Sequence, residues 1–241
     1  MPRIIAHRGA SAHAPENTMP AFELAIEMGA EGIELDVHLS KDNEVVVIHD
    51  ATINRTSDGE GIVKDMTLEE LRKFDFGKWF GDEFEGTHIP ALKEVLELLK
   101  DWDGLLNIEI KGHIEIYAGI EQRVIDLIEA YNMKDNVIIS AFNHFYLRNI
   151  KNIDPDIKIG LLYGVGLVEP WLYAKNIGAE ALHPSYHAID SELIDGCRKS
   201  NVILNPYTID EIEDIRRMID LGVDGIITDY PDRVLAVRDK G

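Results

Sequence analysis

Short apolar segments alternate along the chain with stretches in which apolar residues recur every three or four positions. The short segments are typical of buried strands, and the periodic stretches are typical of helices that pack one face against a sheet. Helical periodicity is clearest after Thr18, after Pro90, and in the stretches Val124–Ile128 and Ile212–Ile219. Nine segments are predicted to be strands: Arg3–His7, Gly32–His38, Val45–His49, Leu105–Lys111, Asn136–Ala141, Lys158–Leu162, Glu180–His183, Val202–Asn205 and Gly225–Thr228.

One neighbouring pair of predicted strands differs from the others. Only six residues separate His38 from Val45, whereas a parallel crossover needs about a dozen, so these two strands are expected to form an antiparallel hairpin. The other eight strands, each followed by a helix or the chain end, fit eight βα units in 241 residues. The sequence therefore predicts a (β/α)8 TIM barrel with an extra hairpin strand. A doubly wound parallel sheet is the alternative.

The segment from about 51 to 89 interrupts this alternation. It contains no strand pattern, and Thr67-Leu-Glu-Glu70 has the spacing of a capping box at the start of a short helix. Such a long irregular stretch is typical of a functional insertion or lid. A packed loop region without a function fits the sequence equally well. No linker or repeat divides the sequence, so residues 1–241 are predicted to form one domain that carries this small inserted segment.

Composition narrows the range of partners and locations. The chain has 24 basic and 44 acidic residues, a net charge of −20, which disfavours nucleic acid and anionic membranes. Its single cysteine, Cys197, excludes an internal disulfide and a cysteine-built zinc site. No apolar stretch has the length of about 20 residues that a transmembrane segment needs, and no signal peptide is expected. The sequence predicts a cytoplasmic protein and is compatible with a homo-oligomer.

Acidic residues lie inside two of the predicted strands. Glu34 and Asp36 are two positions apart and so point to the same face of a strand, and Glu109 precedes Lys111 at the same spacing. Carboxylates inside a barrel are costly unless a cation or a shared proton neutralises them. Solvated acids on edge strands are the alternative, but these strands have the pattern of buried ones. Glu34, Asp36 and Glu109 are therefore predicted to hold one divalent cation, Mg²⁺, Ca²⁺ or Mn²⁺.

Two histidines end strands near this predicted metal site. His7 is the last residue of the first strand, and a turn centred near residues 42–43 places His49 opposite Asp36 across the hairpin. One histidine at a strand end is more often structural than catalytic. Five predicted strands end in polar residues with useful chemistry, however, and that coincidence favours a catalytic pair beside the metal.

Two cationic side chains accompany the histidines. Arg8 follows His7 directly, and Lys111 closes the strand that carries Glu109. A metal ion and an arginine bind the oxygens of a phosphate ester while histidines move protons, so this set predicts phosphoester chemistry. The sequence has neither a Walker loop nor a Gly-x-Ser-x-Gly elbow, which argues against a nucleotide cofactor and a serine hydrolase.

These residues belong to a series of motifs that runs in order along nearly the whole chain. The series is His7-Arg8-Gly9-Ala10, Pro15-Glu16-Asn17-Thr18, Glu34-Leu-Asp36-Val37, Ser40-Lys41-Asp42, Val46-Val47-Ile48-His49-Asp50, Arg55-Thr56, Ile89-Pro90, Asn107-Ile-Glu109-Ile-Lys111, Ser140-Ala-Phe142 and Asp224-Gly-Ile-Ile-Thr-Asp229-Tyr-Pro231. It resembles the glycerophosphodiester phosphodiesterase family. Two departures lie on the side expected to hold the alcohol. Tyr207-Thr208-Ile209-Asp210 stands where the family often has Trp-Thr-Val-Asn, and Ser-Ala-Phe142 where it has Ser-Ser-Phe.

The resemblance implies a barrel with an inserted segment after the hairpin, as the pattern also predicts. It implies hydrolysis of a small-molecule glycerophosphodiester, such as glycerophosphocholine or glycerophosphoethanolamine, to sn-glycerol 3-phosphate and an alcohol. The implied site comprises His7 and His49 for acid–base catalysis, Arg8, Lys111, Phe142 and Tyr207 for substrate binding, and one divalent cation on Glu34, Asp36 and Glu109.

Two other functions compete with this one at the level of sequence. A lysophospholipase D-type phosphodiesterase needs a hydrophobic channel, for which Trp79, Phe80 and Phe84 are candidates. A non-catalytic phosphodiester-binding protein is expected to have lost a catalytic group, but the expected groups are all present.

Overall fold

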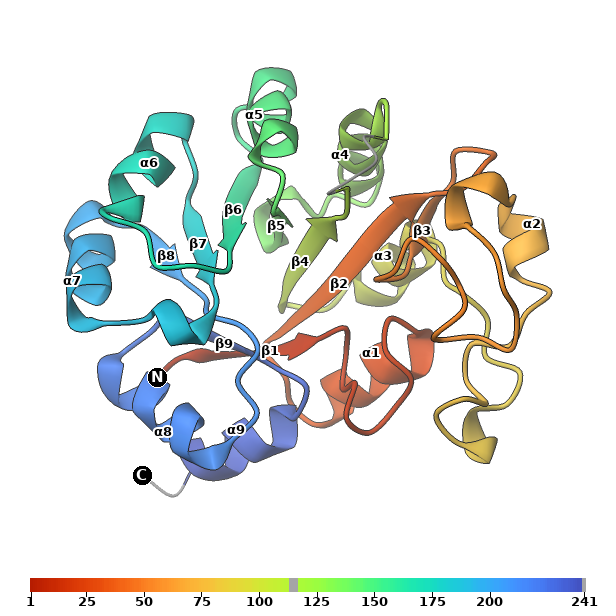
Figure 1. Ribbon diagram of the computed structural model, residues 1–241, viewed down its shortest axis with the longest axis horizontal. Coiled ribbons are helices and arrows are strands. Elements are labelled where there is room, and N and C mark those ends of the chain that lie inside the picture. The colour runs from red at the N-terminus through yellow and green to blue at the C-terminus, as the bar shows by residue number, and fades with distance from the viewer. Residues whose placement is uncertain (113–116, 240–241) are drawn as a thin grey trace.

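The computed structural model describes residues 1–112 and 117–239. Eight parallel strands lie side by side in the order β8-β7-β6-β5-β4-β2-β1-β9, with a helix after each on the outside (Figure 1). The strands are β1 (Arg3–His7), β2 (Gly32–Leu39), β4 (Leu105–Ile110), β5 (Val137–Ala141), β6 (Lys158–Tyr163), β7 (Ala181–Pro184), β8 (Ile203–Leu204) and β9 (Gly225–Thr228). The helices that follow them are α1 (Met19–Glu27), α3 (Leu92–Leu99), α4 (Ile120–Ala130), α5 (His144–Ile153), α6 (Pro170–Ile177), α7 (Ser191–Ser200), α8 (Ile212–Leu221) and α9 (Pro231–Arg238).

Hydrogen bonds between the β8 and β9 regions bring the two ends of the sheet together. The amide of Asp224 donates to the carbonyl of Leu204 at 3.0 Å, and the amide of Ile227 donates to the carbonyl of Pro206 at 3.0 Å. The amide of Ile209 donates to the carbonyl of Ile227 at 2.9 Å. The result is the predicted (β/α)8 TIM barrel, and the alternative of an open, doubly wound sheet is wrong.

Strands β2 and β4, which carry the acidic residues, are buried on both faces, in agreement with their apolar pattern. Every residue of β2 and β4 is buried. Leu35 and Val37 belong to the main core with the helices, so the alternate residues of β2 point into the barrel. An apolar cluster of Ile5, Leu105, Ile138, Ala181 and Ile227 fills the part of the interior near the N-terminal ends of the strands. Polar side chains occupy the part near the C-terminal ends.

The predicted hairpin is present, but its register differs from the prediction by one residue. Strand β3 (Val45–Val47) pairs antiparallel with β2, and the amide of Ile48 donates to the carbonyl of Asp36 at 3.0 Å. Asp36 therefore lies opposite Ile48. The prediction that His49 lies opposite Asp36 is wrong, and His49 follows the end of β3 in a loop.

The turn of the hairpin explains this shift. The amide of Ser40 donates to the carbonyl of Glu44 at 3.0 Å, and the Ser40 hydroxyl accepts from the amide of Glu44 at 2.9 Å. These bonds centre the turn on Asp42 instead of between Asp42 and Asn43. Asn43 adopts a left-handed conformation, with φ at +62°, which asparagine tolerates better than most residues.

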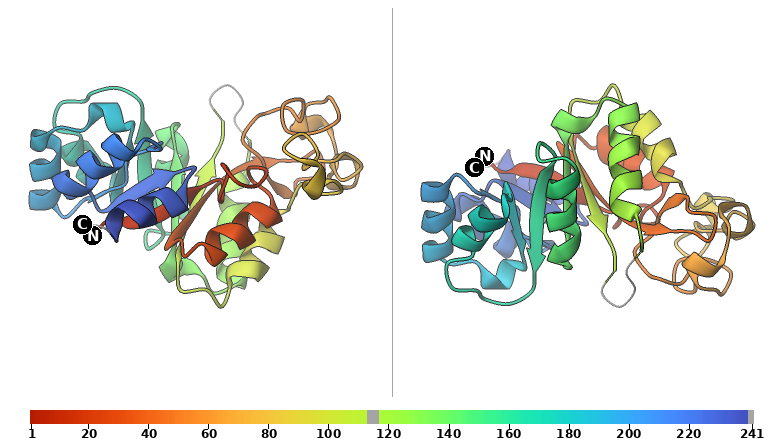
Figure 2. Two further views of the ribbon diagram at one scale, coloured as in Figure 1. Left: turned by 90° about the horizontal axis from the view of Figure 1, so that it is seen from below. Right: turned by 90° about the horizontal axis from the view of Figure 1, so that it is seen from above.

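The segment 51–89, all of which the structure describes, projects from the side of the barrel beside β2 and β3 (Figures 1 and 2). As predicted, it contains no strand, and its helix α2 (Leu68–Leu71) begins with the capping box of Thr67 and Glu70. Two 3-10 segments, Val63–Asp65 and Asp82–Phe84, complete its regular structure. Its apolar residues pack against the hairpin strand and Ala91 in one core, which is formed by Val46, Ile48, Ile53, Val63, Leu68, Leu71, Phe76, Ile89 and Ala91.

Gly9 allows a close approach between the end of β1 and helix α1. Its φ is +81°, and a Cβ atom there would lie 2.6 Å from the backbone carbon of Ala21. Gly29 has nearly the same φ, +82°, but has no atom within 4 Å of such a Cβ. We expect Gly29→Ala to cost about 1 kcal/mol of unfolding free energy and Gly9→Ala about 1–3 kcal/mol more. Urea unfolding of both variants measures the difference, and equal losses would contradict the close approach.

None of the helices in the described part of the chain has the length and apolar character needed to cross a membrane.

Candidate active site

The predicted site residues meet at the C-terminal ends of the strands, the face that carries the active sites of TIM-barrel enzymes. All of them except Asp36 line a cavity of about 220 Å³. Its wall is formed by His7, Arg8, Glu34, His49, Asn107, Glu109, Lys111, Phe142, Leu162, Tyr207, Thr208 and Ile227.

A larger hollow, of about 660 Å³, opens at the opposite face of the barrel. It lies among residues that precede the strands or begin them, such as Arg3, Glu31 and Trp102. None of the predicted site residues lines it, so we identify the candidate site from its side chains and not from cavity size.

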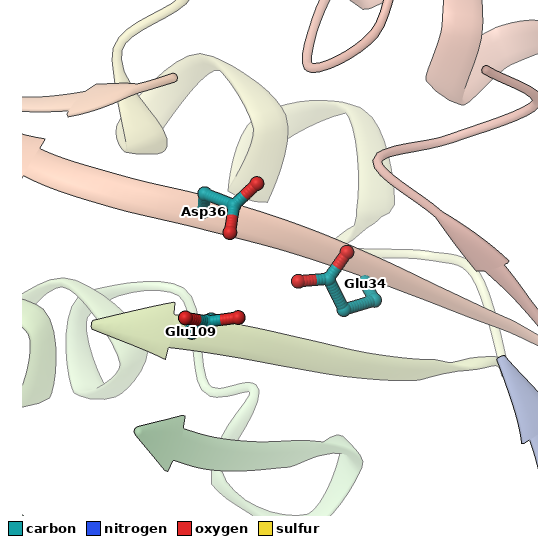
Figure 3. A group of neighbouring side chains, drawn as sticks. All are labelled: Glu34, Asp36 and Glu109. Atoms are coloured by element: carbon teal, nitrogen blue, oxygen red, sulfur yellow. The ribbon is translucent and has the colours of Figure 1, made fainter. Parts of the chain in front are cut away.

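The three predicted metal ligands are buried and converge. Glu34, Asp36 and Glu109 have exposed fractions of 3%, 1% and 7%, and an oxygen atom of each lies within 4.8 Å of one from the others. Figure 3 shows Glu34 and Asp36 on β2 and Glu109 on the adjacent β4, with their carboxylates around a common space. The sheet register explains this geometry, because Asp36 and Glu109 are direct partners across the two strands.

Hydrogen bonds fix one oxygen of Asp36 and one of Glu109. Asp36 Oδ2 accepts from the side-chain amide of Asn17 at 2.8 Å, and Glu109 Oε1 accepts from Lys111 Nζ at 2.7 Å. Asp36 Oδ1 is buried and has no hydrogen-bond partner among the described residues, although Lys111 Nζ lies 3.4 Å from it. A buried oxygen of this kind is expected to have a ligand. Together with the all-oxygen donor set, it fits a hard divalent cation.

Arg8 links the third carboxylate to the cavity. Its backbone is left-handed, with φ at +57°, a conformation that is rare for a non-glycine residue and is found at functional sites. Its amide donates to Glu34 Oε2 at 3.0 Å. The guanidinium donates from Nη1 to Glu16 Oε1 at 2.7 Å, and its Nε lies 3.3 Å from Asp36 Oδ2. The strained turn thus brings both the amide and the side chain of Arg8 to the acidic cluster.

The electrostatics of the cluster also favour a cation. Burial, and next the charge of Asp36, raise the pKa of Glu34 to about 8 and that of Glu109 to about 7. Burial also opposes the charge of Asp36, but Lys111 and Arg8 hold its pKa well below the usual range. Burial therefore opposes the charged forms of Glu34 and Glu109, and a bound cation would stabilise these forms.

Cation binding is therefore expected to depend on pH in a defined direction. Without a cation, the raised pKa values of Glu34 and Glu109 mean that these two side chains bind more protons in the folded chain than in the unfolded chain between about pH 4.5 and 8. Their contribution to stability then falls as the pH rises through this range, and a cation restores it. We expect excess Ca²⁺ or Mn²⁺ to raise Tm little at pH 5 and most near pH 8. Thermal unfolding with EDTA and with cation measures this; an equal rise at both pH values would contradict it.

His7 is held by a carboxylate from the other end of the chain. Its Nδ1 lies 2.6 Å from Asp229 Oδ1, which also accepts from the Ser11 hydroxyl at 3.0 Å. Because a carboxylate only accepts, Nδ1 carries a proton and Nε2 is left for chemistry in the cavity. Burial alone would lower the pKa of His7, but the hydrogen bond to Asp229 and the charge of Glu34 outweigh it, and this pKa is raised.

His49 has a similar hydrogen bond but the opposite shift. Its Nδ1 lies 2.7 Å from Asp50 Oδ1. Burial lowers the pKa of His49, and the charges of Lys111 and Arg8 add to this effect, so the attraction of Asp36 does not restore it. The pKa values of the two predicted catalytic histidines are thus shifted in opposite directions. His7 favours the protonated form, and His49 favours the neutral form.

The sequence did not predict a role for the residues that orient the histidines and the acidic cluster. Asp229, Asn17 and Asp50 stand in the quoted motifs, and Asp50 and Asp229 also follow predicted strand ends; these are the sequence signals that point to them. His38 received none either, although it is buried, with Nδ1 2.7 Å from the Tyr117 hydroxyl and Nε2 3.0 Å from the carbonyl of His49.

Two aromatic side chains, Phe142 and Tyr207, line the cavity. The rings of Phe142 and Tyr207 meet edge to face with centroids 5.9 Å apart. The residues considered for a hydrophobic channel lie elsewhere. Within the insertion, Phe80 meets Trp79 and Phe84 edge to face, and none of the three belongs to the described cavity wall.

The family model described as the Glycerophosphoryl diester phosphodiesterase family matches residues 7–233. The glycerophosphodiester phosphodiesterase of Caldanaerobacter subterraneus subsp. tengcongensis is 55% identical over 238 residues, which cover 99% of this chain and 98% of that protein. The chain therefore belongs to this family and is an enzyme, as predicted.

Solved structures agree in fold. A phosphodiesterase from Oleispira antarctica, in complex with the product sn-glycerol-3-phosphate, superposes with a TM-score of 0.91 at 28% identity, covering 99% of this chain and 97% of that one. A glycerophosphodiester phosphodiesterase from Agrobacterium tumefaciens has a TM-score of 0.86 at 30% identity and covers 98% and 100%.

Proposed function

We propose that this protein hydrolyses small glycerophosphodiesters, such as glycerophosphocholine and glycerophosphoethanolamine, to sn-glycerol 3-phosphate and an alcohol, and that the reaction depends on a divalent cation. The observation that carries the proposal is the convergence of three buried carboxylates beside one cavity, which is lined by two of them, Glu34 and Glu109, and by two histidines and two cationic side chains. We further propose that residues 1–241 act as one domain that includes the insertion.

In this proposal Glu34, Asp36 and Glu109 hold the cation. When bound, it would withdraw charge from a phosphate oxygen and so make phosphorus easier to attack. Arg8 and Lys111 already contact the acidic cluster and line the cavity, where they bind the remaining phosphate oxygens.

The histidines divide the proton transfers. His49, with its lowered pKa, takes the proton of the attacking hydroxyl, which belongs to water or to the glycerol of the substrate. Attack by water gives sn-glycerol 3-phosphate directly, whereas attack by the glycerol hydroxyl gives a cyclic phosphate that water then opens to the same product. His7, with its raised pKa, gives a proton to the leaving alcohol oxygen. Each uses Nε2, because an aspartate occupies Nδ1 in both.

The cavity supports a small substrate. Its volume of about 220 Å³ is below the range of about 300–1,000 Å³ typical of sites for drug-sized ligands. Phe142 and Tyr207 are proposed to contact the alcohol portion, because they line the cavity and face each other.

Release of sn-glycerol 3-phosphate tests the proposal. We expect the purified protein to release it from glycerophosphocholine or glycerophosphoethanolamine, to lose this activity in EDTA, and to regain it with Mg²⁺, Mn²⁺ or Ca²⁺. Lysophosphatidylcholine in mixed micelles is the comparison substrate. Cleavage of the micellar substrate alone would contradict the proposal in favour of lysophospholipase D-type activity.

A further inference from the structure

Arg55, in the insertion, holds two carboxylates at once. Its Nε donates to Asp50 Oδ2 at 2.8 Å and its Nη2 to Asp50 Oδ1 at 3.3 Å. Its Nη1 donates to Glu16 Oε2 at 2.7 Å and its Nη2 to Glu16 Oε1 at 2.8 Å. Such two-point contacts fix the orientation of both partners, because the guanidinium is planar.

Each of the two carboxylates also binds a side chain of the proposed catalytic machinery. Asp50 Oδ1 accepts from His49 Nδ1 at 2.7 Å, and Glu16 Oε1 accepts from Arg8 Nη1 at 2.7 Å. Burial opposes the charge of Asp50, yet the hydrogen bonds with Arg55 and His49 lower its pKa to about 2. Asp50 therefore stays a charged acceptor, and Arg55 is one residue removed from both His49 and Arg8.

The backbone around Arg55 is fixed by the insertion itself. Ile53 is fully buried in the core of the insertion, and its amide donates to the carbonyl of Gly61 at 3.0 Å. The hydroxyl of Ser57 donates to the carbonyl of Ile53 at 2.8 Å. The residues on both sides of Arg55 are thus tied down, so its guanidinium is presented from a packed support.

We propose that Arg55 is a positioning residue for the reaction, and that the insertion takes part in catalysis through it. Without Arg55, the second oxygen of Glu16 becomes available to Arg8, which then forms a closer pair with Glu16 and loses donors for phosphate. Asp50 also loses the two bonds that keep it against His49 Nδ1. This inference rests on the proposed roles of His49 and Arg8.

Kinetics of Arg55→Met, which keeps the length of the side chain and removes its donors, test the inference. We expect kcat to fall about 10–100-fold, the range for loss of a supporting hydrogen bond, and KM to rise severalfold. Arg55→Lys is expected to be intermediate, since an ammonium cannot make the paired contacts. The control is Arg72→Met, which removes another ion pair of the insertion, with Glu94, and is expected to change neither constant by more than about twofold.

Two double variants separate positioning from general support of the fold. In an Asp50→Asn background, Arg55→Met is expected to add little to the loss of kcat; in a Glu16→Gln background, it is expected to add little to the rise in KM. Full additivity in both backgrounds, or unchanged kinetics in Arg55→Met, would overturn the inference.

Nuclear magnetic resonance of the imidazole groups gives a readout that needs no turnover. The Nδ1 proton of His49 is expected to be protected in the wild-type protein and to exchange rapidly in Arg55→Met, with no change in Arg72→Met. An unchanged His49 signal in Arg55→Met would overturn the inference even if no glycerophosphodiester is cleaved. A wild-type protein without activity, but with the expected change at His49, would instead count against the proposed function alone.

Discussion

Replacement of His49 by alanine is expected to lower kcat for glycerophosphodiester hydrolysis by about 10²–10⁴-fold, the usual contribution of a positioned acid or base. His49 lines the cavity, its Nδ1 is taken by Asp50, and its pKa is lowered, so its neutral Nε2 is suited to accept a proton. The affinity for the cation is expected to change little, because the three proposed ligands are carboxylates and His49 is not one of the ligands. Steady-state kinetics and calorimetric titration of Mn²⁺ measure the two quantities.

A matched histidine separates this effect from a general one. His88 is exposed in the insertion, and His88→Ala is expected to leave kcat within about twofold of the wild type. Turnover retained in His49→Ala would remove His49 from the chemistry. A large loss of Mn²⁺ affinity in that variant would mean that the imidazole belongs to the metal site instead.

Glu109→Gln is expected to have effects of opposite sign with and without a cation. The pKa of Glu109 is raised to about 7 by burial and by the charge of Asp36, so at pH 8 the cation-free fold bears the cost of an ionised, buried carboxylate. Glutamine removes that cost and is expected to increase the unfolding free energy in EDTA by roughly 1–3 kcal/mol. With one of its three ligands gone, the cation is expected to bind at least about 100-fold more weakly.

Glu121 provides the control for this prediction. It is also a buried glutamate, with 7% of its surface exposed, but it lies on α4 and accepts from Asn149. Glu121→Gln is expected to leave the cation affinity unchanged. Unfolding in EDTA and in Mn²⁺ at pH 8, together with Mn²⁺ titration, gives both effects for each variant. Unchanged Mn²⁺ affinity in Glu109→Gln would exclude Glu109 as a ligand.

The barrel and the meeting of its polar strand ends could be predicted because both depend on local patterns. A buried strand of β2's length shows its inward residues by the period of two, so Glu34 and Asp36 share a face. Once the strands are parallel and adjacent, their C-terminal ends must lie at one face. Alignment of the ends of β2 and β4 is enough to make Asp36 and Glu109 partners across the two strands.

The contacts that orient the catalytic groups could not be predicted in the same way. The hydrogen bond between His7 and Asp229 joins residues 222 positions apart, and no periodicity specifies such a pair. The prediction of the hairpin register was wrong for a local reason, because the hydrogen bonds between Ser40 and Glu44 centre the turn half a residue away from the predicted position. Because of that shift, Ile48 and not His49 lies opposite Asp36. His49 is placed at the cavity by the loop that follows β3.

The insertion shows the same limit. Its capping box at Thr67 could be predicted, since both partners lie within one turn. Its contact with the site could not, because Arg55 reaches Glu16 across 39 positions. Sequence alone therefore left a functional segment and a packed excursion equally acceptable.

Anomalous diffraction from crystals grown with Mn²⁺ and sn-glycerol 3-phosphate tests most directly whether the three carboxylates hold the cation at the place of hydrolysis. The expected result is one strong manganese peak bounded by oxygens of Glu34, Asp36 and Glu109, with the phosphate group beside it and in contact with Arg8 and Lys111. A manganese peak away from these carboxylates, or a phosphate group bound at the opposite face of the barrel, would contradict the assignment.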